Sequence, residues 1–135
     1  MTAAPPPSRL QIAHQLAAHL GHRDFDKVAE LLSPEVTYRV EGNHVLAGRF
    51  HGPEEVMTHV QEVAERTGDT YDPFKWDDWL VGDQHVAALF RIRAQGHGAV
   101  FSAKILVLFG FDSADKVSEI RVFFDDAEGA DRFFI

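Results

Sequence analysis

The sequence contains no cysteine at any of its 135 positions. This absence excludes disulfide bonds, thiolate nucleophiles and cysteine-ligated metal sites. Clusters of basic residues are also missing, because 13 Lys and Arg face 21 Asp and Glu and the formal net charge is −8. Binding to nucleic acid or to an anionic membrane surface requires clustered positive charge, so we expect no nucleic-acid and no membrane partner.

Long apolar runs are absent as well. The longest, residues 105–109, is far too short to span a bilayer. Residues 1–7 have neither the basic start nor the apolar centre of a signal peptide, and their three consecutive prolines predict an extended, disordered tail. With 45% hydrophobic and 25% charged residues, the remainder predicts one globular domain over residues 8–135 and a cytoplasmic location.

Aromatic residues are plentiful by contrast, since 11 phenylalanines favour a substantial core or an aromatic-lined cavity. The clearest element is a hairpin of two strands, residues 99–111 and 116–124, joined by a polar turn. Side chains alternate between the faces of a strand. We therefore expect one apolar inner wall, formed by Phe101, Ala103, Ile105, Val107, Phe109, Ile120, Val122 and Phe124, with Val117 and Phe123 outward.

Three helices are predicted in the first half of the chain. Ser8 and Gln11 match a capping box for a helix that ends near Gly21. A second helix should begin at Asp24 and end before residue 33, and a third should run from residues 52–53 to about residue 66. Strands are expected at residues 36–40, 74–81 and 85–94 besides the hairpin. This order indicates an α+β domain with a curved antiparallel sheet and helices on one side.

Four fragments carry a resemblance to a known family: RDFD at residues 23–26, LLSPEV at 31–36, GRFHG at 48–52 and KVSEIR at 116–121. Over about residues 8–126 the chain resembles the nuclear-transport-factor-2-like superfamily, and within it the SnoaL-like polyketide cyclase and ketosteroid isomerase branch. The resemblance implies a cone, in which a strongly curved antiparallel sheet wraps around three helices and encloses a pocket. It also implies a homodimer.

The resemblance places apolar residues where the isomerases carry their catalytic groups. Val40 stands at the position of the general base, Leu16 at that of the oxyanion tyrosine and Val107 at that of the protonated aspartic acid. Steroid-type isomerisation by that machinery is therefore not expected.

The sequence does not match the epoxide hydrolase branch of the superfamily, and it matches the cyclase-like members only loosely. Lys104, Leu106 and Val122 cannot supply the arginine and two aspartates of the epoxide hydrolase branch. Cyclase-like members use a carboxylate late in the last strand, and Asp125 or Asp126 lies near that position.

His59 is the first candidate for chemistry. It lies within the apolar stripe that Val56, Val60 and Val63 form on the third predicted helix. An imidazole that faces an apolar cavity can act as a general acid or base near neutral pH, with a pKa lowered by desolvation. The alternative is a core histidine bonded to a backbone carbonyl.

Tyr38 and Asp126 complete the candidate catalytic set. Tyr38 shares a strand face with Val40, so its hydroxyl could donate to a developing oxyanion; it could equally be a core tyrosine. Asp126 follows the inward series of the last strand and could shuttle a proton at an apolar rim. Its alternative role is the N-cap of a terminal helical segment at residues 127–132. Which of Asp125 and Asp126 faces inward stays open.

A predicted binding wall surrounds these groups. The candidate ligand-contacting residues are Leu16, Val40, Trp76, Phe90, Ile92, Ile105, Val107, Phe109, Val122 and Phe124. Trp76 and Trp79 should point to opposite faces of their strand. The eight histidines show no metal-site spacing, and no phosphate-binding or dinucleotide-binding motif occurs, so we expect neither metal nor cofactor.

Two functional hypotheses follow from this set. The first is a small cofactor-free enzyme that binds an apolar or aromatic molecule and moves a proton, as in cyclisation, isomerisation or dehydration. The second is a non-catalytic small-molecule-binding or dimerisation domain, in which the apolar faces serve only ligand or partner. A homodimer is expected in either case, because outward Leu89, Leu106, Leu108 and one tryptophan would form a contiguous apolar patch.

Overall fold

The computed structural model describes residues 8–135, and the tail predicted at residues 1–7 lies outside this range. The helices in the described part are α1 (Arg9–Gly21), α2 (Phe25–Leu31), α3 (Gly52–Arg66) and α4 (Ala127–Phe133). The strands are β1 (Leu32–Val40), β2 (Gly48–His51), β3 (Asp72–Val81), β4 (His85–Gly96), β5 (Ala99–Phe111) and β6 (Val117–Phe124).

The helix boundaries follow from local chemistry. At the start of α1, the Ser8 hydroxyl accepts from the Gln11 backbone N–H at 3.2 Å, and the Gln11 side chain accepts from the Ser8 N–H at 2.8 Å. This reciprocal pair is the capping box that the sequence predicts. Pro53 lies in the first turn of α3, where its missing N–H is not needed, and Glu54 and Glu55 face the positive end of the helix dipole.

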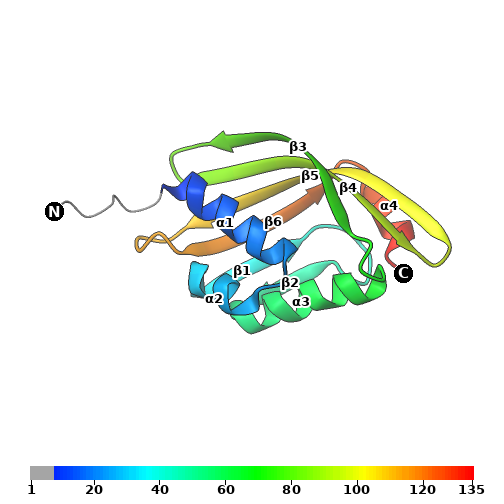
Figure 1. The fold of residues 1–135 in the computed structure, drawn as a ribbon, viewed down its shortest axis with the longest axis horizontal. Helices are drawn as coiled ribbons and strands as arrows, with labels where there is room; N and C mark the ends of the chain where they lie inside the picture. Colours follow the sequence, from blue (N-terminus) through cyan, green and yellow to red (C-terminus); the bar gives the residue numbers. More distant parts are fainter. Residues whose placement is uncertain (1–7) are drawn as a thin grey trace.

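One six-stranded sheet carries the fold, in the order β2-β1-β6-β5-β4-β3. The α+β class is confirmed, with one refinement to the antiparallel sheet: β1 pairs in parallel with β6, while the other neighbours are antiparallel. Figure 1 shows α1 crossing one face of the sheet and α3 lying along β1 and β2. The fourth helix, α4, follows β6 and lies near the beginning of β5, where Phe133 packs against Phe101.

The prediction that Val117 points outward is wrong. Val117 and Ile120 are fully buried, and Val122 on the same strand is buried as well. The pairing of β5 with β6 shifts between Gly110 and Phe111, which adds one residue to the β6 side of the ladder. Such a bulge reverses the facing of the residues before it, so Val117 joins the inner face.

The prediction that Trp76 and Trp79 occupy opposite faces is also wrong. Their rings stack, with centroids 5.3 Å apart and planes 13° apart. The pairing of β3 with β4 shifts between Trp76 and Asp78, so an extra residue separates the two tryptophans. Both rings lie on the inner side, where Trp76 contacts Phe90 at 4.5 Å between centroids.

The inner face of the sheet and the helices enclose the core. The inward residues predicted for β5, from Phe101 to Phe109, are buried, and Leu16 and Val56 pack onto them from α1 and α3. Among residues 8–135, no helix has the length and apolar character needed to cross a membrane.

Candidate functional site

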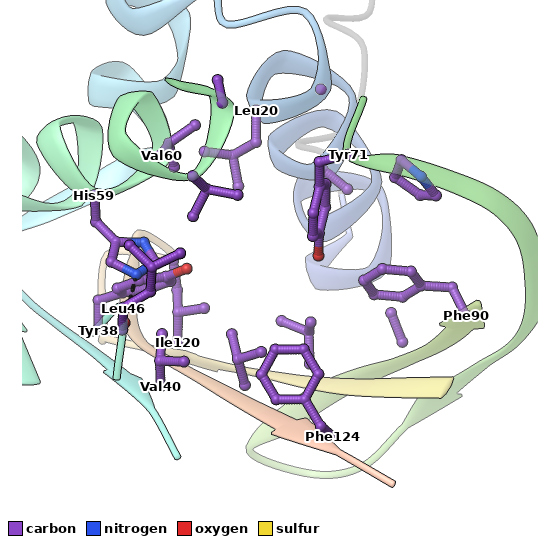
Figure 2. Close-up of a pocket in the computed structure, with 18 of the residues that line it drawn as sticks. Leu20, Tyr38, Val40, Leu46, His59, Val60, Tyr71, Phe90, Ile120 and Phe124 are labelled. Carbon is purple, nitrogen blue, oxygen red and sulfur yellow. Dashed lines mark hydrogen bonds between the residues drawn. The ribbon is translucent and has the colours of Figure 1, made fainter. Parts of the chain in front are cut away.

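A cavity of about 290 Å³ remains between the helices and the inner face of the sheet. Its wall is predominantly apolar, with contributions from α1, α3, β1, β3, β4, β5, β6 and the loop between β1 and β2 (Figure 2). The imidazole, hydroxyl and charged groups of this wall belong to Arg23, Tyr38, His44, His59, Asp69 and Tyr71.

His59 enters the cavity wall from α3 and is only 4% exposed. Its Nε2 lies 2.8 Å from the carbonyl oxygen of Leu46. A carbonyl oxygen can only accept, so Nε2 carries the hydrogen. The other ring nitrogen, Nδ1, is buried and has no hydrogen-bond partner within residues 8–135. His59 therefore holds a basic lone pair that the described chain leaves unused.

The same residue, Leu46, also orients a second histidine. The Leu46 N–H donates to Nδ1 of His44 at 3.2 Å. Nδ1 must then be unprotonated in the neutral ring, which places the hydrogen of His44 on Nε2. This Nε2 is buried and makes no hydrogen bond within the described residues. The backbone of Leu46 thus fixes opposite tautomers in the two rings. Nδ1 of His59 is left as a free acceptor, and Nε2 of His44 is left as a free donor.

Burial lowers the pKa of both imidazoles. For His59, desolvation outweighs the hydrogen bond to Leu46 and the negative charge of Glu62, and the neighbouring His44 lowers the pKa further. For His44, desolvation outweighs the opposing effects of Asp131 and the Glu41 backbone, so its pKa is lowered as well. Both rings are accordingly neutral at pH 7.

The loop that carries His44 and Leu46 is held by the C-terminal segment. Asp131 of α4 accepts from the Asn43 N–H at 2.8 Å, and the carbonyl of Phe134 accepts from Val45 at 3.3 Å. The chain can approach His44 this closely because position 42 is glycine: a Cβ at Gly42 would lie 2.8 Å from the His44 ring. The C-terminal helix therefore positions the two histidines indirectly.

Tyr38 lies beside His59 on the cavity wall. Their rings are 4.9 Å apart at an interplanar angle of 62°, and Phe50 packs against both. The Tyr38 hydroxyl points toward the open space (Figure 2). Burial raises the pKa of this hydroxyl well above its usual value, so it stays protonated and can donate.

Tyr71 approaches the cavity from another side (Figure 2). It follows the turn after α3, which the Thr70 hydroxyl braces: this group lies 2.6 Å from the Thr67 carbonyl and accepts from the Gln95 N–H at 2.7 Å. Burial raises the pKa of the Tyr71 hydroxyl, and the nearby Tyr38 adds to the effect. Both tyrosines of the chain therefore present neutral hydroxyls to one cavity.

An ion pair lies at the exposed end of the wall. Arg23, in the turn between α1 and α2, binds Asp69, in the turn between α3 and β3. Both side chains are exposed, and both residues have positive φ, 54° and 61°. The pair joins two turns that the sequence separates by 46 residues, and it forms part of the mouth of the cavity.

The structure brings most of the predicted site residues to this cavity. His59 and Tyr38 line it, together with Val40, Trp76, Phe90, Val107, Phe109, Val122 and Phe124. Three predicted contact residues do not: Leu16, Ile92 and Ile105 are fully buried in the core and are not part of the cavity wall. Their side chains point inward as expected, but neighbouring core residues cover them.

Asp126 does not reach the cavity. Its side chain accepts from the Gly129 N–H at 2.9 Å and caps α4, which was its alternative role. Asp125 instead accepts from the Lys104 N–H at 3.0 Å on the outer part of the hairpin. Neither carboxylate is therefore placed to shuttle protons inside the cavity, because the chain turns away from the sheet immediately after Phe124.

Sequence reasoning missed His44, Leu46 and Tyr71. His44 and Leu46 lie between the predicted strand at residues 36–40 and the third predicted helix, where no pattern gave a reason to place them against α3. Tyr71 had a weak signal, because it is one of only two tyrosines and lies three residues before a predicted strand. Within residues 8–135, no three His, Cys, Asp or Glu residues gather in a way that could hold a metal ion.

Comparisons with known proteins agree with this architecture. The profile of the family described as SnoaL-like domain matches residues 13–120. An uncharacterized protein of Mycobacterium tuberculosis is 23% identical over 125 residues, which cover 93% of this chain and 95% of that protein.

Solved structures show the same fold. A protein of unknown function with a cystatin-like fold from Xanthomonas campestris has a TM-score of 0.86 at 22% identity, covering 95% of this chain and 98% of its own. An NTF2-like protein from Burkholderia xenovorans has a TM-score of 0.81 at 16% identity, covering 94% of this chain and 95% of its own. The resemblance to the nuclear-transport-factor-2-like superfamily, with its α+β cone, is thereby confirmed.

Proposed function

This chain belongs to the SnoaL-like domain family, and on that premise we propose that its cavity binds a compact apolar or aromatic molecule and transfers a proton on it. The observation that carries the proposal is His59, a residue of the predominantly apolar cavity wall whose Nδ1 has no hydrogen-bond partner within residues 8–135 and whose ring packs against that of Tyr38. Reactions of this class include isomerisation, cyclisation and dehydration.

The size of the cavity supports a small ligand. Ligand sites range upward from about 300 Å³, and a dry cavity of about 150 Å³ accepts benzene. A volume of about 290 Å³ therefore suits one or two fused rings. The aromatic side chains of Trp76, Phe90 and Phe109 offer faces and edges against which such rings can pack.

The proton transfer would proceed in two steps. His59 Nδ1 removes a proton from a carbon next to a carbonyl group, and the electrons of the broken C–H bond form an enolate. The Tyr38 hydroxyl donates a hydrogen bond to the enolate oxygen. The imidazolium then returns the proton to the same or another carbon, which restores neutral His59. The lowered pKa of His59 keeps the ring in the basic form at pH 7.

We would test this with 2-tetralone, a two-ring ketone with exchangeable protons beside its carbonyl. In D₂O, NMR follows the replacement of these protons by deuterium. We expect the protein to accelerate the exchange, and His59→Gln to reduce the acceleration about 100-fold or more. Glutamine can still donate to the Leu46 carbonyl but offers no base. His51→Gln, at an exposed histidine of β2, is the matched control and should change nothing.

Two outcomes would contradict different parts of the proposal. Binding of tetralone without accelerated exchange would refute the catalytic step and support a non-catalytic ligand-binding domain, because the cavity holds no carboxylate except Asp69 among the described residues. Absence of tetralone binding, together with absence of binding by apolar bicyclic compounds, would refute the cavity as a ligand site.

We also propose a homodimer through the outer face of β4, β5 and β6. Leu89, Leu106 and Phe123 lie in register on neighbouring strands and form one row on this face. All three are half-buried in the monomer. Ion pairs of Asp77 with Arg91 and Lys104 lie beside the row and would form its polar rim.

A further inference from the structure

We propose that the ligand of this cavity is a neutral molecule with a hydrogen-bonding oxygen at each of two ends, and that Tyr71 binds the end remote from His59. This inference rests on the proposed ligand-binding function and specifies the class of molecule. It assigns to Tyr71 a role in specificity that is independent of proton transfer.

The two tyrosine hydroxyls enter the cavity from different sides. Figure 2 shows Tyr38 and His59 on one side of the open space and Tyr71 on another, with both hydroxyl oxygens directed into it. Tyr38 is fixed by β1 and by packing against Phe50 and His59. Tyr71 is fixed by the braced turn at Thr70. Because Tyr38 and Tyr71 lie on separate elements, the rearrangement of a single loop cannot bring one hydroxyl to the other.

Both tyrosines are partly buried, and both line the cavity. A ligand that fills the cavity without bonding to a hydroxyl would desolvate that group, at a cost of about 1–3 kcal/mol. Phenylalanine would fill the same space without that cost, and the chain uses it at 11 other positions. Two tyrosines on one cavity therefore point to a ligand with a polar group for each.

The charged groups of the cavity wall offset one another. Both histidines are neutral at pH 7 because burial lowers the pKa of each. Arg23 and Asp69, the charged residues of the wall, neutralise each other at the mouth. An ionised ligand inside would therefore lack a counter-ion, and burial of an unpaired charge is costly. Neutral hydroxyl or carbonyl groups fit both the tyrosines and the Nδ1 of His59.

A series of isosteric bicyclic probes tests the inference on the unmodified protein. Naphthalene has no polar end, 2-naphthol has one, and 2,6-dihydroxynaphthalene has one at each end. Binding can be followed by the fluorescence of Trp76, which lines the cavity, with calorimetry as a second measurement. Each added hydroxyl should tighten binding by about threefold to tenfold.

Conservative variants then locate the two ends. Tyr71→Phe should weaken the dihydroxy probe by about threefold to tenfold and leave naphthalene unchanged or tighter. Tyr38→Phe should do the same, and the double variant should bind all three probes alike. Ser102→Ala, which removes an exposed hydroxyl from the outer side of β5, is the matched control and should have no effect.

The outcomes separate this inference from the proposed function. If naphthalene binds but the hydroxyls add nothing in the unmodified protein, the two-ended ligand is wrong while the cavity remains a binding site. If the dihydroxy probe is preferred but Tyr71→Phe leaves its affinity unchanged, the assignment of Tyr71 is wrong. If no probe of the series binds, the ligand-binding function and this inference both fail.

Discussion

His59 donates from Nε2 to the carbonyl oxygen of Leu46 over 2.8 Å, and this bond fixes the tautomer of the ring. We expect ¹⁵N NMR of the free protein at pH 7.5 to show a protonated Nε2 and an unprotonated Nδ1 at His59. The proposed base depends on this pattern, because a hydrogen on Nδ1 would remove the lone pair from the cavity. Observation of the Nδ1–H form would therefore refute the proton-transfer step.

The buried histidines also predict how stability depends on pH. The unfolded chain protonates His59 and His44 near the usual pKa of 6.5, whereas the folded protein does so only at lower pH. Between these values the unfolded state binds more protons, so the free energy of unfolding falls as the pH decreases. The stabilisation is complete above pH 6.5 and is lost progressively below it.

Chemical denaturation at pH 7.5 and pH 5.5 measures this dependence. We expect the difference in the free energy of unfolding between the two pH values to be smaller in His59→Phe than in the unmodified protein, and also smaller in His44→Phe. His51→Phe, at an exposed position, is the comparison. An equal pH dependence in the unmodified protein and in His59→Phe would show that His59 is not protonated less readily in the folded state.

Asp126 offers a test that separates capping from chemistry. Its side chain accepts from Gly129 at the start of α4. Asp126→Ala should lower the free energy of unfolding by about 1 kcal/mol, whereas Asp126→Asn should change it little, because asparagine caps helices equally well. Asparagine cannot shuttle protons. If Asp126→Asn abolishes exchange of tetralone while keeping stability, the carboxylate takes part in catalysis and its assignment as a cap is incomplete.

Part of the fold was predictable from the sequence, and part was not. The capping box at Ser8, the limits of α3 and the inward face of β5 were predictable, because each depends on spacing within one element. Facing failed at Val117 and at Trp79, where a single extra residue in one strand shifts the register. Alternation carries no information about bulges, so these errors could not be avoided by counting.

The candidate site was also predictable only in part. His59 was predictable from its stripe on α3, whereas the role of the His44 and Leu46 loop was not. That loop is held by Asp131 and Phe134, which lie about 90 residues further along the chain. Hydrogen bonds over such separations leave no periodic signal, and the same holds for the contact between Arg23 and Asp69.

The ion pair of Arg23 and Asp69 predicts a kinetic effect. We expect Asp69→Asn to accelerate release of bound 2-naphthol by about twofold to fivefold, because an exposed pair contributes up to about 1 kcal/mol. Asparagine tolerates the positive φ at this position, so the turn should persist. Stopped-flow fluorescence measures the rate.

Salt and a second ion pair provide the controls. Raising the salt concentration screens exposed charges and should accelerate release from the unmodified protein but not from Asp69→Asn. Arg132→Gln breaks the exposed pair with Glu128 on α4 and should leave the rate unchanged. If neither salt nor Asp69→Asn alters release, the pair does not restrict the mouth.

The outer face of the sheet carries the proposed dimer interface. Leu89, Leu106 and Phe123 form an apolar row across three strands. Large contiguous apolar patches are uncommon on the surfaces of monomeric proteins. Both tryptophans face inward, so the proposed interface depends on this row without the tryptophan once expected there. Light scattering at micromolar concentration should show a dimer, and Leu106→Glu should yield a folded monomer because it places charge in the centre of the row. Leu80→Glu, at an exposed leucine of the edge strand β3, should leave the dimer intact. A monomeric unmodified protein, or equal behaviour of the two variants, would show that this face is not the interface.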